Sequence, residues 1–416
     1  MRRPPVAAVL LLVSLGLVRP QAGDVGARLL ADPAVRKALE WVKQNEPRVL
    51  EDQVRLCEIP APPFKETQRG EAYKQLFEKL GLKNVRVDAV GNVLGERPGR
   101  APRPHLVFTA HLDTVFPEGT PVKTTREGSV IRAPGIGDDS RGLAVVLGVI
   151  RALDQMKIET PGSITFVGTV GEEGLGDLRG VKRLFSDTLK GKIDRFVSVD
   201  GTGLGITHIA VGSLRYKVTF RGPGGHSYGA FGLANPIHAL GRAVARISEF
   251  EVPAQPKTTF NVGRIGGGTS VNAIPFDAWF EMDLRSADEA ALKAVNEKFH
   301  RAVDTALKEE NARAGRRGLL EVAKDLVGSR PAGRTPEDSP IVQAAVSVTR
   351  ALGFEVSLRE GSTDANVAIS LKVPAITISG GGGGSGAHSP DESFLVTDSW
   401  KGTQRAFLVA LALSRD

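Results

Sequence analysis

The sequence has almost no cysteine, since Cys57 is the single one among 416 residues. One thiol cannot form a disulfide within a chain. A disulfide-stapled fold of the kind found in small exported proteins is therefore excluded. The fold has to be held by its hydrophobic core alone.

A long apolar run is also missing at the N-terminus. The run from Val6 to Val18 is too short for a comfortable membrane span, and Arg2-Arg3 precedes it while Gln21-Ala22-Gly23 supplies small residues for cleavage. Residues 1–22 are therefore expected to be an export signal, with an uncleaved anchor as the alternative. The mature protein is then periplasmic or secreted, with no stable membrane contact after cleavage.

A concentrated basic patch is the third missing feature. The net charge is +7, but Lys and Arg are scattered among acids, and only residues 313–317 are mildly clustered. Nucleic-acid binding needs such an excess to be gathered on one face. The charge pattern therefore indicates a generally basic surface and no nucleic-acid partner.

The length of 416 residues is too great for one compact core, so two domains are expected. Hydrophobic residues make up 41% and charged residues 24%, which is ordinary for a globular protein. The catalytic domain is expected over residues 23–210 and 329–416. A βαββαβ order over residues 211–328 favours a small inserted domain with a ferredoxin-like α+β sheet.

A buried strand ending in His111-Leu-Asp113 is the centre of the chain's organisation. Leu106 to Ala110 is a short apolar run, typical of a strand buried on both faces. His111 and Asp113 lie two residues apart and share one side at the strand end. The carboxylate can hold one imidazole nitrogen and leave the other free for a metal ion. A satisfied structural histidine is the alternative for this motif alone.

The same pattern of strand, acidic loop and helix then repeats along the chain. In an open α/β sheet the loops at the carboxyl ends of the strands converge on one crevice. A histidine also follows the glycine run that begins at Gly380. The candidate metal ligands on these loops are His111, Asp139, Glu172, Glu173, Asp200 and His388.

Two imidazoles and four carboxylates are too many for one tetrahedral zinc ion. They suit two divalent ions about 3.5–4 Å apart that share a carboxylate and a water molecule. One of the adjacent acids Glu172 and Glu173 can then bind metal while the other acts as a base. Two alternatives are open at this point: Asp139 also fits a simple helix cap, and Asp138 is interpreted as structural.

The chain resembles the co-catalytic dizinc exopeptidases and deacylases. These include peptidase T, glutamate carboxypeptidase, aminoacylase and succinyl-diaminopimelate desuccinylase. The resemblance runs from about Ile59 to His388, with the motifs in the family order. It implies an α/β, zinc-exopeptidase-like catalytic domain with a central mixed sheet flanked by helices, and an inserted lid and dimerisation domain.

The resemblance also implies roles for the site residues. Glu172 matches the general base, and Asp113 matches the carboxylate that orients the first histidine. The second Asp of Gly137-Asp-Asp139 matches the bridging ligand. The matched metal ligands are His111, Asp139, Glu173, Asp200 and His388. They hold two divalent ions, with Zn²⁺ expected and Co²⁺ or Mn²⁺ compatible with so many carboxylates.

In the inserted domain, His226 of Gly224-Gly-His226-Ser resembles the family's lid histidine, which reaches a partner's active site in dimeric members. The resemblance therefore implies a homodimer formed through the lid domain; an exposed loop histidine is the alternative. Substrate-holding positions are implied at Asn272, Arg285, Gly361, Thr363 and Gly381, although Arg285 also fits an ordinary ion pair.

The expected function is an exported dizinc hydrolase that cleaves an amide bond in small peptides, on the peptidase T side of the family. The chain departs from the family pattern at one place, which weakens its assignment to a subgroup. Many members carry Lys-Gly after the bridging Asp, and this chain has Ser140-Arg141. An N-acyl amino acid deacylase or a glutamate carboxypeptidase-like enzyme is the alternative. A non-catalytic binding protein on the same fold requires a lost ligand or base, and none is missing.

Overall fold

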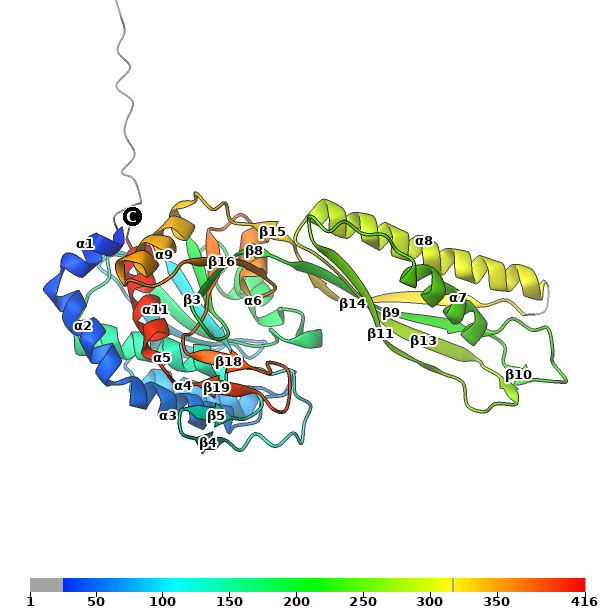
Figure 1. Cartoon of the computed structure of the whole chain (residues 1–416), viewed down its shortest axis with the longest axis horizontal. Helices are drawn as coiled ribbons and strands as arrows, with labels where there is room; N and C mark the ends of the chain where they lie inside the picture. Colours follow the sequence, from blue (N-terminus) through cyan, green and yellow to red (C-terminus); the bar gives the residue numbers. More distant parts are fainter. Residues whose placement is uncertain (1–24, 316–317, 416) are drawn as a thin grey trace, which may run out of the picture.

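The structure is a computed structural model that describes residues 25–315 and 318–415. The expected export signal over residues 1–22 lies outside the described residues. No helix in the described part is long and apolar enough to cross a membrane. Figure 1 shows a rounded body on the left and an elongated unit on the right, joined by strands that run between them.

A mixed sheet forms the centre of the rounded body, in the order β1-β2-β6-β3-β7-β17-β8-β15, with β16 paired to β8. Strands β6, β3, β7 and β17 are parallel neighbours, whereas β2 and β8 run antiparallel to this core. The strands are β1 (Lys83–Val87), β2 (Val93–Arg97), β3 (Leu106–His111), β6 (Ile164–Thr169), β7 (Arg195–Val199), β8 (Gly205–Ala210), β15 (Gly333–Arg334), β16 (Ser357–Gly361) and β17 (Ala375–Ile378).

Helices cover both faces of this sheet because its central strands are apolar on both sides. In β3, Leu106 and Phe108 belong to one buried cluster and Val107 to another. The first cluster packs against α1 (Val25–Ala31), α2 (Pro33–Gln44), α3 (Glu46–Cys57), α4 (Thr67–Lys79), α5 (Ser140–Gln155), α9 (Pro340–Ala351) and α11 (Trp400–Leu413). The second packs against α6 (Arg179–Arg183), the short π-helix η3 (Leu184–Thr188) and α10 (Ala365–Ser370).

A small antiparallel sheet lies beside the carboxyl ends of the central strands. It has the order β18-β19-β5-β4 and consists of β4 (Thr125–Glu127), β5 (Val130–Arg132), β18 (Gly383–Ser385) and β19 (Ser393–Leu395). Ser393 of β19 pairs with Arg132 of β5. This pairing brings the segment after His388 next to the turn that carries Asp138 and Asp139.

The elongated unit has its own sheet in the order β11-β13-β9-β14, with two helices on one face. Its elements are β9 (Gly212–Arg221), α7 (Pro236–Ser248), β11 (Thr258–Gly267), β13 (Asp277–Ser286), α8 (Glu289–Ala314) and β14 (Glu321–Arg330). A short pair at its far end joins β10 (Gly225–His226) to β12 (Ala273–Ile274). The βαββαβ order and the predicted fold class are confirmed.

The stretch from Arg330 to Pro336 contains the end of one strand and the whole of another. Arg330 ends β14 and is buried, and Gly333 and Arg334 form β15 on the edge of the central sheet. The stretch combines Gly and Pro, which favours a loop in a sequence-based prediction. Pairing with β8, more than a hundred residues earlier, decides its conformation.

Candidate metal and active site

His111 closes strand β3 and is almost completely buried. Its Nδ1 lies 3.0 Å from the carbonyl oxygen of Asp113, so Nδ1–H donates there and Nε2 is the nitrogen left for a ligand. Nε2 lies 2.9 Å from Oδ1 of Asp138. The imidazole is thereby oriented with one nitrogen turned into a group of acids.

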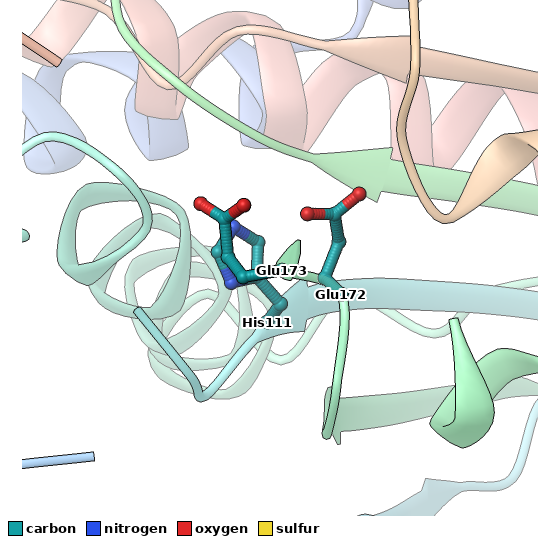
Figure 2. Close-up of side chains that lie close together, drawn as sticks. All are labelled: His111, Glu172 and Glu173. Carbon is teal, nitrogen blue, oxygen red and sulfur yellow. The ribbon is translucent and has the colours of Figure 1, made fainter. Parts of the chain in front are cut away.

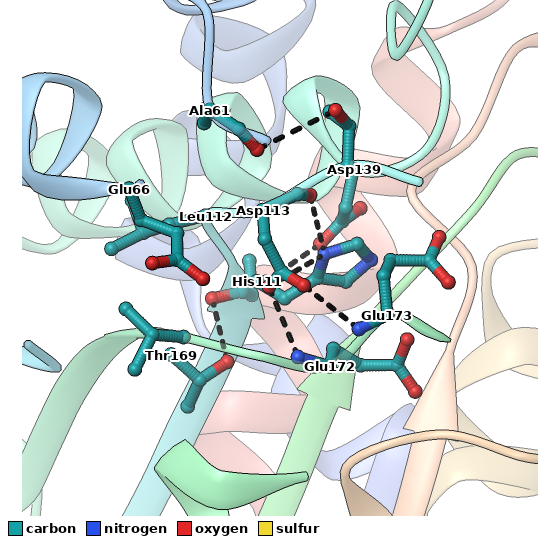
Figure 3. A network of polar contacts seen from close by, with 12 residues as sticks. Ala61, Glu66, His111, Leu112, Asp113, Asp139, Thr169, Glu172 and Glu173 are labelled. Carbon is teal, nitrogen blue, oxygen red and sulfur yellow. Dashed lines mark hydrogen bonds and ion pairs between the residues drawn. The ribbon is translucent and has the colours of Figure 1, made fainter. Parts of the chain in front are cut away.

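Asp113 acts mainly on the backbone of the next loop. Its two carboxylate oxygens accept the backbone N–H groups of Glu172, at 3.0 Å, and Glu173, at 2.8 Å. The His111 Nδ1 lies farther away, 3.7 Å from the carboxylate. Asp113 therefore aligns the two glutamates as well as the histidine loop, as Figure 3 shows.

The two adjacent aspartates exchange the places that the sequence interpretation gave them. Asp139 is fully buried, accepts the N–H of His111 at 3.0 Å, and caps α5 by accepting the N–H of Gly142 at 3.0 Å. Asp138 instead lies between the imidazoles of His111 and His388, at 2.9 and 3.2 Å. The assignment of Asp139 as the bridging ligand is corrected: Asp138 is the acid that two metal ions would share, and Asp139 has the capping role.

Two groups of three potential ligands share this one carboxylate. His111, Asp138 and Asp200 form one group, and Asp138, Glu173 and His388 form the other; within each, ligand atoms lie within 4.8 Å of one another. Imidazole nitrogens and carboxylate oxygens are donors that suit Zn²⁺, Co²⁺ and Mn²⁺. The residues present therefore fit two divalent ions, which the two groups would hold with Asp138 in common.

Burial and mutual repulsion perturb these acids. Burial raises the pKa of Asp200 well above its usual range, and the Asp138 carboxylate adds to the rise. Hydrogen bonds to Asp138 and then Glu173 raise the pKa of His388 to about 10. Buried carboxylates crowded against each other favour a bound cation, because a cation removes the repulsion.

Glu172 has a different partner from Glu173. Figure 2 shows both carboxylates turned to the same side of the strand end that carries His111. Glu173 Oε1 lies 3.1 Å from His388, whereas Glu172 Oε1 accepts from Arg330 at 3.0 Å. Burial raises the pKa of Glu172 to about 8, opposed by the Arg330 charge. A carboxyl group with a raised pKa can accept and return a proton near neutrality.

A cleft of about 370 Å³ opens above these acids between the central sheet and the elongated unit. Its wall on the side of the elongated unit carries Arg215, Arg285 and Arg330. Arg215 Nη1 also donates to the carbonyl oxygen of Gly174, which joins the two units beside the cleft. Gly361 and Thr363, both predicted substrate positions, line the cleft as well.

Three of the predicted lid and substrate-holding residues lie outside this cleft lining. His226 and Asn272 are exposed at the far end of the elongated unit, where the carbonyl of Asn272 accepts the N–H of Ser227 at 2.9 Å. Gly381 pairs with Gly203 and packs so tightly on α11 that an added Cβ would lie 2.4 Å from a carbonyl oxygen. Within this one chain the fold brings Arg285 to the site, but not these three.

Comparison with known proteins agrees with this geometry. A model of peptidase family M20/M25/M40 matches residues 107–412, most of the chain. The chain belongs to this family. It is accordingly a metal-dependent hydrolase of amide bonds, and the predicted membership in the dizinc peptidase and deacylase group is confirmed.

Among M20 relatives, carboxypeptidase G2 from a Pseudomonas species is 28% identical over 341 residues, covering 78% of this chain and 79% of that protein. Aminopeptidase PepT from Bacillus cereus has a similar fold: the TM-score is 0.70 at 22% identity, over 89% of this chain and 99% of that one. The YXEP protein of Bacillus subtilis, a dinuclear metal binding peptidase, has a similar fold: the TM-score is 0.63 at 18% identity, over 89% of this chain and 99% of that one.

Two residues near the base of this M20 chain were not among the predicted site residues. Arg330 contacts Glu172 across 158 positions of sequence, from a stretch whose Gly and Pro favour a loop. Asp364 is fully buried and accepts from Thr169 Oγ1 at 2.5 Å; burial raises its pKa to about 6. The motif Gly361-Ser-Thr-Asp364 was a signal for a site loop, but nothing local to Arg330 distinguishes it from the other arginines.

Proposed function

We propose that this M20 member is a dizinc exopeptidase that hydrolyses small peptides carrying a free carboxylate. The observation that carries the proposal is the juxtaposition of three features in one cleft: two ligand groups that share Asp138, the buried base candidate Glu172, and a wall of three arginines. Ligands, base and substrate-binding cations are the parts that amide hydrolysis requires.

Two divalent ions, Zn²⁺ in the first place, are proposed to be held by the two ligand groups that meet at Asp138. When bound, such a pair supplies Lewis-acid activation of a water molecule and of the substrate carbonyl. Asp113 and Asp139 contribute by fixing the backbone around His111, Glu172 and Glu173.

Glu172 is proposed to move the proton. One of its oxygens is held by Nη1 of Arg330 at 3.0 Å, which leaves the other free to take a proton from the attacking water. The same oxygen then returns this proton to the nitrogen of the leaving amine. Nη2 of Arg330 also donates to the carbonyl oxygen of Glu172, so the base is fixed at both its side chain and its backbone.

Arg215 and Arg285 are proposed to bind the substrate's carboxylate. Both are held in place by Asp283, at 3.2 Å and 2.6 Å, and both line the cleft. Guanidinium groups bind carboxylates through paired N–H donors. In a short peptide this carboxylate is the C-terminus, so the wall favours an exopeptidase over an enzyme that cleaves within long chains.

An N-acyl amino acid deacylase or a glutamate carboxypeptidase-like enzyme is the second candidate. The observation in its favour is that carboxypeptidase G2 is a relative along most of both chains. Such substrates also present a carboxylate, so the arginine wall suits both candidates.

A substrate panel distinguishes them. Zinc-loaded protein is offered tripeptides, dipeptides, N-acetyl amino acids and glutamate conjugates, each with its amidated counterpart, beside Glu172→Gln and a chelated sample. Turnover of free tripeptides, lost on amidation and in both controls, is expected. Turnover of acylated amino acids alone would replace the peptidase proposal with the deacylase. Activity that survives Glu172→Gln would show that another residue is the base.

A homodimer is proposed from the placement of His226. This histidine is exposed at the end of the elongated unit farthest from the cleft (Figure 1), so it can act on a cleft only in a second copy. Mixing Glu172→Gln with His226→Ala is expected to restore activity, because a mixed dimer contains one site with both residues. Additive, unrestored activities would contradict this.

Export is proposed from the basic start and the short apolar run over residues 2–18. The test is the N-terminus of the protein recovered from outside the cytoplasm, determined by mass spectrometry. Cleavage near residue 22 is expected, and recovery of the intact chain in the membrane fraction would indicate the uncleaved anchor instead.

A further inference from the structure

Glu392 is a buried acid four residues after His388, and the proposed mechanism gives it no role. It is 2% exposed. Its Oε2 accepts the N–H of Gly135 at 2.7 Å, and its Oε1 accepts the N–H groups of Gly137 and Asp138, at 2.8 and 3.0 Å. One side chain therefore binds three backbone groups of a single turn.

That turn presents the carboxylate shared by both ligand groups. Asp138 leaves the turn and meets the imidazoles of His111 and His388. Gly135 has a φ of +79°, and a Cβ at Gly137 would lie 3.0 Å from the Glu392 carboxylate. Glycine at both places lets the backbone close around the acid. The backbone of this turn therefore packs closely around the Glu392 carboxylate.

The small antiparallel sheet explains how an acid 254 residues away in sequence reaches this turn. The backbone of Glu392 accepts the N–H of Ala133, and the next residue, Ser393, pairs with Arg132. Segment 388–392 thus contacts Asp138 at two places. His388 contacts its side chain, and Glu392 accepts a hydrogen bond from its backbone N–H.

We infer that Glu392 is a positioning residue for the bridging ligand, and that it couples the two metal sites by locking the Asp138 turn to the His388 segment. The inference rests on the proposed dinuclear site. Without the lock, repulsion from Glu173 and Asp200 can push Asp138 away from both histidines. Outer partners of metal ligands typically change metal affinity by about 10–100-fold.

The test compares Glu392→Ala, Glu392→Gln and the control Asp391→Ala, an exposed neighbour in the same segment. Gln keeps one oxygen for Gly137 and Asp138 but turns an NH₂ group toward the N–H of Gly135. Zinc affinity is measured by competition with a chromophoric chelator, and site geometry by the visible spectrum of the Co²⁺ form. The thermal midpoint of the metal-free protein is measured in parallel.

Zinc affinity is expected to fall by about 10–100-fold in Glu392→Ala, less in Glu392→Gln, and not in Asp391→Ala. The Co²⁺ spectrum is expected to change in the same order. Wild-type affinity in a folded Glu392→Ala overturns the inference, even with a lowered thermal midpoint, because the role is then only structural. If Glu392→Ala does not fold, wild-type affinity in Glu392→Gln overturns it. A wild-type protein that binds no zinc refutes the proposed function itself.

Discussion

Replacing each of the adjacent aspartates by asparagine gives opposite expected outcomes, because the fold assigns them different partners. Asp138 offers its carboxylate to two imidazoles and belongs to both ligand groups. Asp138→Asn removes the shared charge from both groups at once. If this costs about 4 kcal/mol of the stabilisation that a metal pair supplies, kcat falls by about 10³-fold.

Asp139→Asn acts on stability instead. Asparagine keeps one oxygen and caps helices well, but its NH₂ group then opposes one of two buried donors, the N–H of His111 or of Gly142. A buried donor left without a partner costs about 1–3 kcal/mol. At about 2–4 °C for each kcal/mol, the thermal midpoint falls by roughly 2–12 °C.

The assay is zinc stoichiometry by atomic absorption, followed by kcat at saturating zinc and thermal unfolding of the metal-free protein. Asp138→Asn is expected to lose bound zinc and activity with little change in the metal-free midpoint. Asp139→Asn is expected to keep both ions and unfold earlier. If Asp139→Asn lost the metal while Asp138→Asn retained both ions, the assignment drawn from the structure would be refuted.

Three further outcomes are expected. Arg330→Met leaves the buried Glu172 without its cation. Removing one partner of a buried pair costs about 2–5 kcal/mol, so kcat/KM should fall about 100-fold. An unchanged kcat/KM would show that Arg330 does not contribute to the site. Burial raises the pKa of the Cys57 thiol to about 11, so it should resist a disulfide reagent at pH 8 until the protein unfolds; rapid native labelling would contradict its burial. In the inserted domain, burial favours neutral Glu310, but the hydrogen bonds from Arg313 and the Asn235 N–H, together with the charges of Arg313 and Arg242, outweigh burial and lower its pKa. Its ionised form therefore stabilises the fold above about pH 4, and this contribution is lost as pH falls through the lowered folded pKa. The amount by which Glu310→Gln lowers the thermal midpoint should therefore shrink in acid. A difference in midpoint that grows in acid would show that the pKa of Glu310 is raised and not lowered.

Local patterns were sufficient for the elements and for most of the site. The apolar run that ends at His111 became β3, and the βαββαβ order predicted over residues 211–328 is present in the elongated unit. Burial of apolar surface fixes such elements locally, since hydrophobic spacing reports the period of a helix or strand. The strand-end positions of His111, Glu172, Glu173 and Asp200 followed because parallel strands present their carboxyl ends at one edge.

The tertiary structure decided what no local pattern contains. Whether Asp138 or Asp139 faces the histidines depends on the path of the backbone through a turn that Glu392 holds from 254 residues away. The contact of Arg330 with Glu172 depends on where β14 ends against the central sheet. The sequence by itself determined which chemistry the chain carries, because ligand types and strand periods are local. Which of two neighbouring acids performs it was decided only by packing, because long-range contacts orient each side chain.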